Sequence, residues 1–162
     1  MEHSPEDDRD DVVLVEVAEG SSVPVRSTVG SAGVDLAAAV DFVVEPGRRL
    51  LVSTGLKLVI PKGSYGQIKG RSGLATKYID CHDGVVDSDY RGPIKVLLKN
   101  NSNDVFIGSR GDRIAQLLIL PVITATFKLA QGSVEAVAPT ERGSGGFGST
   151  GGVGSDPEVS QR

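Results

Sequence analysis

The segment DGVVDSDYRG, from Asp83 to Gly92, places the carboxylates of Asp83, Asp87 and Asp89 beside a tyrosine. Like charges this close together are costly unless a metal, a cation or solvent separates them, so this segment is a candidate catalytic site. In an extended strand, Asp87 and Asp89 would share one face. A solvent-exposed acidic hairpin turn is the alternative interpretation.

The segment GRSGLA, from Gly70 to Ala75, carries an arginine, a hydroxyl and a glycine just before a short helix that we expect over residues 72–78. A helix start offers unpaired backbone N–H groups, so it suits a phosphate. Arg71 would add a positive charge, and Ser72 a hydroxyl donor and a helix cap. A plain capped turn without a ligand is the alternative.

Two further polar side chains stand in apolar surroundings. Asp35 lies within SAGVDLAAA, where a carboxylate is unusual without a partner, and Gln116 lies within the apolar strand of RGDRIAQLLI. The tripeptide Arg110–Asp112 matches an integrin-binding signature. Because the chain shows no secretion signal, we expect this tripeptide to form a turn that leads into a buried strand.

Cys81 and His82 are neighbours, which raises the possibility of an activated thiol. Neighbours in a strand point to opposite faces, so the imidazole is poorly placed to activate the thiol, and a lone buried cysteine is favoured. With one cysteine and two histidines in the chain, a zinc site of the usual composition is excluded. A site for an oxygen-ligated ion remains open.

Short β-type runs dominate the chain from Val12 onward. In PIKVLLKN, the side chains of Ile94, Val96 and Leu98 fall on one face and the lysines on the other, the period of two that is typical of a half-buried strand. Turn signals recur at short intervals, which predicts many short strands that close into a sandwich or barrel. The last of these runs extends through residues 116–130.

Composition limits the function classes. The 162 residues fit one domain, and the single cysteine favours a reducing, intracellular setting. No apolar run is long enough to span a bilayer, and we expect no membrane partner. A net charge of −4 without a block of basic residues argues against a nucleic-acid partner bound by broad phosphate neutralisation.

Five segments, taken in order, resemble the five motifs of the homotrimeric, all-β dUTP pyrophosphatases (dUTPases). They are SAGVDLAA, GRSGLA, GVVDSDYRG, RGDRIAQLLI and RGSGGFGSTG, and the resemblance extends from about Val12 to Gly151. It implies a jelly-roll-like, distorted β-barrel subunit with one short helix, a homotrimer, and the hydrolysis of dUTP to dUMP and pyrophosphate with Mg²⁺. It also implies a role in limiting uracil in DNA and in supplying dUMP for dTTP synthesis.

The resemblance assigns roles to individual residues. Asp87 matches the catalytic aspartate that activates the water attacking the α-phosphorus, a task that a carboxylate general base can perform. Asp35 matches the aspartate that contacts magnesium through a water. The residues that match phosphate-binding positions are Arg71, Ser72, Gly73, Gln116, Arg142, Ser149 and Thr150. Those that match base- and sugar-binding positions are Gly84, Tyr90, Lys95, Phe147 and Gly148.

In the family, the tyrosine ring lies against the deoxyribose and excludes a ribose 2′-OH. The hairpin from about Cys81 to Lys95 would read uracil through its backbone groups. Three positions depart from the common pattern: Gly70 replaces a frequent proline, Cys81 replaces an asparagine found in some members, and Asp83 adds a carboxylate near the base pocket.

The glycine-rich segment near the end of the chain resembles a lid. Its glycines permit motion and close wrapping, while Phe147 would cover the uracil ring and Arg142 would reach the phosphates. We therefore expect a disordered acidic leader at 1–11, a β core at 12–140, the lid at 141–151 and a flexible tail at 152–162. In the family, the lid closes on the site of a neighbouring subunit.

Two alternatives remain. A dCTP deaminase of the same fold would need a glutamate for proton transfer, and no glutamate lies between Glu45 and Glu135. A non-catalytic nucleotide-binding protein with a regulatory role would be free to lose its catalytic residues, whereas all five motifs are complete here.

Overall fold

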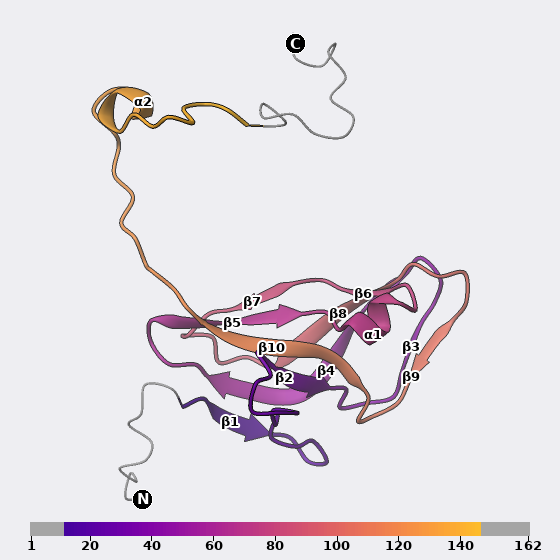
Figure 1. The fold of residues 1–162 in the computed structure, drawn as a ribbon. Coiled ribbons are helices and arrows are strands. Elements are labelled where there is room, and N and C mark those ends of the chain that lie inside the picture. The colour runs from indigo at the N-terminus through magenta and orange to yellow at the C-terminus, as the bar shows by residue number, and fades with distance from the viewer. Residues whose placement is uncertain (1–11, 147–162) are drawn as a thin grey trace, which may run out of the picture. The chain divides into compact units, whose positions relative to one another are not determined.

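The computed structural model describes residues 12–146, and these form strands linked by turns, with two short helices (Figure 1). A compact unit of strands ends at Thr124, and residues 125–146 belong to a second unit. Among the described residues, no helix is long and apolar enough to cross a membrane.

Two four-stranded antiparallel sheets make up most of the compact unit. The order of the first sheet is β1 (Leu14–Val17), β4 (Arg49–Val59), β8 (Ile94–Asn100) and β6 (Ile79–Cys81). The order of the second sheet is β2 (Val34–Ala37), β10 (Arg113–Pro121), β5 (Ser64–Lys69) and β7 (Gly84–Val86). A two-stranded ribbon pairs β3 (Phe42–Val44) with β9 (Phe106–Gly108). This architecture is the all-β, jelly-roll-like fold expected from the sequence.

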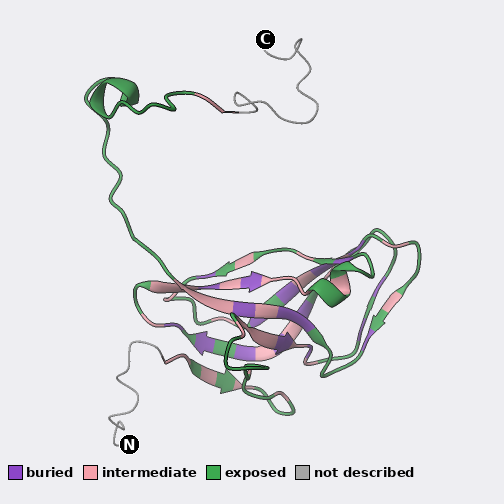
Figure 2. Ribbon diagram, viewed as in Figure 1, coloured by how far each residue is buried: buried purple, intermediate pink, exposed green. Residues whose placement is uncertain are grey.

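The core lies between the two sheets, because alternate side chains of each strand point inward. Ile94, Val96 and Leu98 of β8 are 2%, 0% and 0% exposed, as their period of two predicts. They belong to the same apolar cluster as Leu36 of β2 and Leu117 of β10, on the opposite sheet. Figure 2 shows the buried residues alternating along the paired strands.

Asn100 is a buried polar residue at the end of β8. Its Nδ2 donates to the carbonyl oxygens of Val44, at 2.8 Å, and Asp104, at 2.7 Å. Its Oδ1 accepts from the backbone N–H and the hydroxyl of Ser102, at 2.9 and 2.7 Å. Because every polar atom of the amide has a partner, this side chain fixes the turn after β8 against β3.

The helix expected over residues 72–78 is shorter than predicted. α1 covers Ser72–Ala75, and its N-cap is Arg71 rather than Ser72, with no side-chain capping hydrogen bond. Tyr78 then adopts a left-handed φ of 61°, a conformation that a helix cannot continue through. The chain consequently turns directly into β6.

The last strand also ends earlier than its sequence pattern predicted. β10 stops at Pro121, and residues 122–130 are not in regular structure. Ile123, Phe127 and Leu129 are 90%, 96% and 99% exposed. The apolar alternation is that of a strand, but no described strand pairs with this segment, so its apolar side chains stay in solvent.

The second unit contains a helix that the sequence pattern did not predict. α2 covers Val134–Val137, and the Ser133 side chain caps it by accepting a hydrogen bond from the N–H of Ala136 at 3.2 Å. In this unit the Arg142 Nε donates to the carbonyl of Gly145 at 2.9 Å, which closes a local turn.

Candidate functional site

Asp35 of β2 lies at the centre of a cluster of charges. One of its carboxylate oxygens is 3.0 Å from Nε of Arg71, and the other is 3.2 Å from Nη1 of Arg113 and 3.2 Å from the Ser27 hydroxyl. The Asp35 side chain is only 21% exposed. These contacts are the partners that a carboxylate in this apolar segment requires.

Gln116 of β10 ties the same cluster to the turn that follows β5. In the sheet register it lies opposite Asp35 on one side and Lys69 on the other. Its Nε2 donates to the carbonyl of Gly70 at 2.9 Å. The register of β10 thus brings together three segments that are far apart in sequence.

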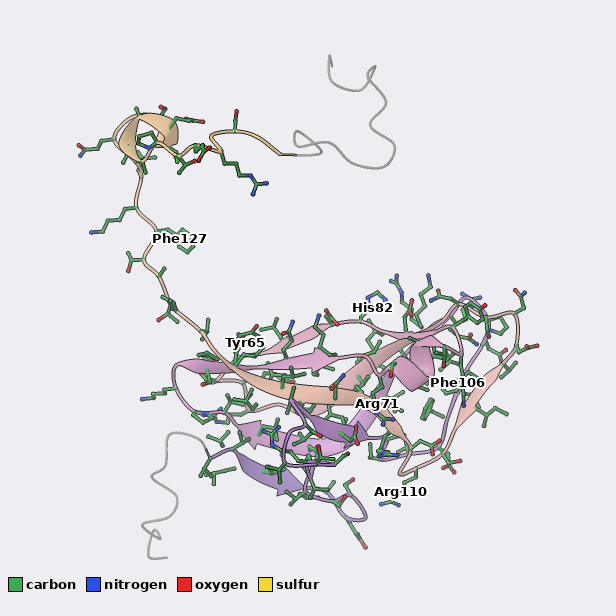
Figure 3. The ribbon with its side chains drawn as sticks, in the orientation of Figure 1. Tyr65, Arg71, His82, Phe106, Arg110 and Phe127 are labelled. Atoms are coloured by element: carbon green, nitrogen blue, oxygen red, sulfur yellow. The ribbon has the colours of Figure 1, made fainter. Side chains whose placement is uncertain are left out.

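The turn after β5 presents its polar groups to solvent. The Nη1 of Arg71 also donates to the Arg113 carbonyl at 3.2 Å, so its guanidinium is held beside β10, where Figure 3 labels it. Ser72 and Gly73 are exposed at the start of α1, and a Cβ at Gly73 would meet no atom within 4 Å. A pocket of about 670 Å³ opens here, lined by Gly70, Arg71, Ser72, Ala75, Ile79, Asp80, Cys81, His82 and Asp83.

A second pocket, of about 390 Å³, is lined by the described residues that have predicted base, sugar and catalytic roles. Gly84, Asp87, Tyr90 and Lys95 all line it, from β7, the following turn and β8. Its remaining walls are mostly apolar and come from Leu51, Ile68, Val85, Val86, Pro93 and Ile94. A pocket with an apolar wall and a few polar groups suits a flat organic ring with a polar edge.

The backbone around Asp87 forms a tight turn. β7 ends at Val86, so Asp87 and Asp89 do not share a strand face as the pattern suggested. The N–H of Tyr90 donates to the Asp87 carbonyl at 3.1 Å, which closes the turn. Arg91 then holds it from outside, because its Nη1 donates to the carbonyls of Ser88 and Tyr90, at 2.7 and 2.9 Å.

The Asp87 carboxylate is exposed, and among the described residues it takes part in no side-chain hydrogen bond or ion pair. Its lone pairs are therefore free to accept a hydrogen bond from water. A carboxylate held on a fixed turn beside a pocket is well placed to act as a general base.

Two contacts fix the outer end of the Tyr90 side chain. Its hydroxyl donates to the Pro93 carbonyl at 3.2 Å. Its ring packs against Gly92 so closely that a Cβ at this glycine would overlap the ring. The ring therefore has one defined orientation at the pocket wall, as a steric filter requires.

Asp83, the additional carboxylate near the base pocket, forms an ion pair with Lys69. One of its oxygens accepts a hydrogen bond from the Nζ of Lys69. Burial and, secondarily, the negative charge of Asp83 raise the pKa of the Cys81 thiol to about 11. The thiol donates to the His82 carbonyl at 3.4 Å. A thiol with so high a pKa is a poor nucleophile, which supports the interpretation as a structural cysteine.

The tripeptide Arg110–Asp112 forms the turn before β10. The Ser109 N–H donates to the Asp112 carboxylate at 2.8 Å, and the guanidinium of Arg110, which Figure 3 labels, donates to the Glu19 carbonyl at 2.8 Å. These side chains hold the turn in place, so the interpretation as a turn leading into a strand is confirmed.

Residues 141–146 of the predicted lid are described, and Arg142, which contacts Gly145, is the one among them with a predicted binding role. Phe147, Gly148, Ser149 and Thr150 lie outside the described residues. Sequence reasoning missed Arg113. The available signal was a basic residue at the start of an apolar strand, three positions before Gln116.

The number of hydrogen bonds that the Asp35 carboxylate can still accept shows how this cluster could contact a magnesium ion. Among the described residues, no group of three His, Cys, Asp or Glu side chains could hold a metal. A carboxylate has about four acceptor positions, and Asp35 already receives three donors, so about one remains. That capacity fits one hydrogen bond from a metal-bound water. Mg²⁺ commonly keeps several waters and binds substrate phosphates.

Comparison with known proteins places these observations in a family. The dUTPase family model matches residues 19–151. A deoxyuridine 5′-triphosphate nucleotidohydrolase of Sinorhizobium medicae is 47% identical over 161 residues, which cover 92% of this chain and 98% of that protein.

Solved structures agree with the sequence relatives. A dUTPase of Staphylococcus bacteriophage 80alpha, determined with dUpNHpp, superposes with a TM-score of 0.80 at 25% identity and covers 87% of this chain and 99% of that one. A phage phi11 dUTPase, described with a structural Mg(II) ion, superposes with a TM-score of 0.72 at 24% identity, over 77% of this chain and 99% of that one. On its sequence and on its fold, the chain belongs to the dUTPase family.

Proposed function

We propose that this protein hydrolyses dUTP to dUMP and pyrophosphate. The observation that carries the proposal is the pocket of about 390 Å³ that gathers Gly84, Asp87, Tyr90 and Lys95. Family membership gives these residues their expected roles, and the geometry is compatible with each of them.

In the proposed reaction, Asp87 acts as general base. Its carboxylate accepts a proton from a water, the water oxygen forms a bond to the α-phosphorus, and the bond from that phosphorus to the oxygen bridging to the β-phosphorus breaks. Pyrophosphate leaves with the electron pair of the broken bond, and dUMP remains. The Asp87–Tyr90 turn, held by Arg91, keeps the base in position before the substrate arrives.

The phosphates are assigned to the other cluster. Arg71 and Gln116, with the exposed Ser72 and Gly73, would bind them, and Arg113 adds a second positive charge beside Asp35. Asp35 would orient the two arginines and contact a magnesium-bound water through its remaining lone pair. When bound, Mg²⁺ supplies charge neutralisation on the phosphate oxygens.

Base and sugar selection would follow from the pocket. Tyr90, fixed by Pro93 and Gly92, would stand where a ribose 2′-OH would have to fit. The backbone around Gly84 would pair with the uracil edge, so a cytosine amino group would leave groups unpaired and a thymine methyl would clash.

We propose that the active form is a homotrimer that exchanges its C-terminal arms. Two features support this. Arg71 and Ser72, predicted to bind phosphate, line one pocket of the chain, and the predicted base and sugar residues Gly84, Tyr90 and Lys95 line another, so contact with a second chain can complete a site. Ile123, Phe127 and Leu129 alternate along an exposed segment, a pattern suited to pairing with a strand of another subunit (Figure 3 labels Phe127). The lid at 141–151 would follow this exchanged segment to a neighbouring site.

The cellular role would be to limit uracil in DNA by removing dUTP and to supply dUMP for dTTP synthesis. Since both nucleotides are intracellular metabolites, we place the reaction inside the cell. The single cysteine agrees with that setting.

The test is pyrophosphate release from dUTP, dCTP, dTTP and UTP, each with Mg²⁺ and with a chelator, beside an Asp87→Asn variant. We expect turnover of dUTP alone, and only with Mg²⁺. The Asp87→Asn variant should reduce the rate by about 10²–10⁴-fold, the range that general base catalysis contributes. Deamination of dCTP would support the deaminase alternative. Tight dUTP binding without turnover in the wild type would support the regulatory one.

A further inference from the structure

Lys69 and Asp83 form an ion pair among residues that line the two candidate pockets. Ile68 and Gly84 line the smaller pocket, and Gly70 and Asp83 line the larger one. Lys69 is the last residue of β5, and Asp83 directly precedes β7. Ile68 pairs with Gly84 in the ladder between these strands, so Lys69 and Asp83 are the next opposed residues along it. The Nζ of Lys69 donates to a carboxylate oxygen of Asp83, which closes the open end of the ladder.

The chain next to each member of the pair carries a candidate functional group. After Lys69 the chain enters the turn of Arg71 and Ser72, and Asp83 is followed by Gly84, which lines the base pocket. The ion pair is therefore a side-chain link between the turn at residues 70–72, here called the phosphate turn, and the hairpin from about Cys81 to Lys95, here called the base hairpin.

The phosphate turn needs such a restraint because it begins with a glycine. Gly70 has a wide choice of backbone angles, and the nearest atom to a Cβ placed there would be Cβ of Cys81 at 3.5 Å, so no tight packing confines it. From the β10 side, the side chain of Gln116 holds the Gly70 carbonyl at 2.9 Å. From the β7 side, the restraint is the contact between Lys69 and Asp83.

Because Lys69 and Asp83 are partly exposed, their loss can affect nucleotide binding without unfolding the protein. The side chains of Lys69 and Asp83 are 42% and 52% exposed. Exposed ion pairs contribute little to global stability, so variants of this pair should fold. Any effect on nucleotide binding would then arise from the position of the hairpin and the turn.

We propose that Lys69 and Asp83 are positioning residues that hold two elements of the chain, the start of the base hairpin and the phosphate turn, each in the geometry in which it binds nucleotide. This inference rests on the proposed function for its kinetic test. Because the pair contacts no reacting atom, its loss acts on the KM for dUTP and leaves kcat nearly unchanged.

The kinetic test uses Asp83→Asn, Lys69→Met and the charge-reversed double variant Lys69→Asp/Asp83→Lys. Each single variant should raise the KM for dUTP by about fivefold, the equivalent of the roughly 1 kcal/mol of an exposed pair, with kcat changed by less than about twofold. The reversed pair should recover most of the loss, because it restores the attraction across the ladder.

A matched control pair lies on the other sheet. Glu16 and Lys57 are also opposed across an antiparallel ladder, their charged atoms are 2.8 Å apart, and their side chains are 71% and 47% exposed. Glu16→Gln and Lys57→Met should leave both kcat and KM unchanged. An equal rise in KM in these controls would overturn the proposal, and so would an unchanged KM in Asp83→Asn and Lys69→Met.

A second measurement tests the positioning role of the pair independently of dUTP hydrolysis. Amide hydrogen exchange of residues 80–86, measured without nucleotide, should be faster in the single variants than in the wild type and should return toward the wild-type rate in the reversed pair. If the wild type fails to hydrolyse dUTP, the proposed function fails, while the exchange rates still decide the positioning role. Equal exchange in all four proteins would contradict that role.

Discussion

The carboxylate of Asp35 accepts a hydrogen bond from the Nε of Arg71, 3.0 Å away, and this ion pair connects strand β2 to the turn before α1. The two side chains are 21% and 29% exposed, so the pair is partly shielded from water. An arginine held in this way keeps part of its guanidinium for a ligand while its orientation is fixed.

Replacing Asp35 by Asn should therefore disorient Arg71. We expect kcat/KM for dUTP to fall by about 10–100-fold, the effect of losing an outer contact that orients a binding group. A titration with Mg²⁺ separates two causes: an unchanged half-saturating concentration indicates action through the arginine, and a raised one indicates loss of the metal-bound water. Asp104→Asn is the control, because the Asp104 carboxylate is exposed and makes no side-chain contact with the residues that the structure describes.

Changing Tyr90 should alter the choice between dUTP and UTP. Tyr90→Ala removes the ring and should reduce the discrimination against UTP by about 10-fold or more, the effect of opening space in a fitted pocket. Tyr90→Phe keeps the ring and should retain most of the discrimination. Because Gly92 packs against this ring, Gly92→Ala should displace it and resemble Tyr90→Ala. Discrimination as strong as in the wild type after Tyr90→Ala would exclude a steric filter at this residue.

The pKa of Cys81 predicts a stability change at alkaline pH. It is raised from its ordinary value of 9.0 to about 11, mainly by burial and then by the charge of Asp83. Between these values the unfolded chain loses the thiol proton while the folded chain keeps it, so the free energy of unfolding falls as pH rises through this window. The stability contribution is fully present below about pH 9.

Urea unfolding from pH 8 to pH 11 measures this effect, and subtraction of the Cys81→Ser curve removes the titration of lysines and tyrosines. Parallel curves for the two proteins would contradict the assignment. The Asp83→Asn variant should also react faster with iodoacetamide at pH 8.5, because removal of one cause of the shift increases the thiolate fraction.

Deletion of everything after Pro139 should preserve the fold and reduce turnover. The compact unit ends at Thr124, well before the deletion, so circular dichroism and thermal unfolding should change little. We expect kcat/KM for dUTP to fall by about 100-fold or more, because a closing segment orders the substrate and excludes water. An unchanged rate would remove the lid from the mechanism.

The buried amide of Asn100 should matter for stability. Asn100→Ala leaves the carbonyls of Val44 and Asp104 without this donor and should reduce the free energy of unfolding by about 2–3 kcal/mol. The neighbouring Asn101, whose exposed side chain contacts Asp80, is the control, and Asn101→Ala should cost less than about 1 kcal/mol. Similar losses in both variants would contradict a special role for the buried amide.

Local sequence pattern was sufficient where each residue's environment depends on its own strand. The alternation in Ile94–Asn100 predicted which side chains are buried, because successive residues of a strand face opposite sides. The same rule failed for residues 122–130. Alternating apolar and polar side chains show that a segment can form a strand, but pairing also requires a partner strand. No described strand pairs with residues 122–130.

By itself, the sequence determined the all-β class, the family and the residues able to do chemistry, because motifs and periodicity are local properties of the chain. Only the tertiary structure decided that Asp35 contacts Arg71 and Arg113, that Asp87 stands on a turn beyond β7, and that Asp83 pairs with Lys69. These relationships depend on the registers of β10 with β2 and of β5 with β7. A register is set by the packing of whole strands against the core, so no single segment encodes it.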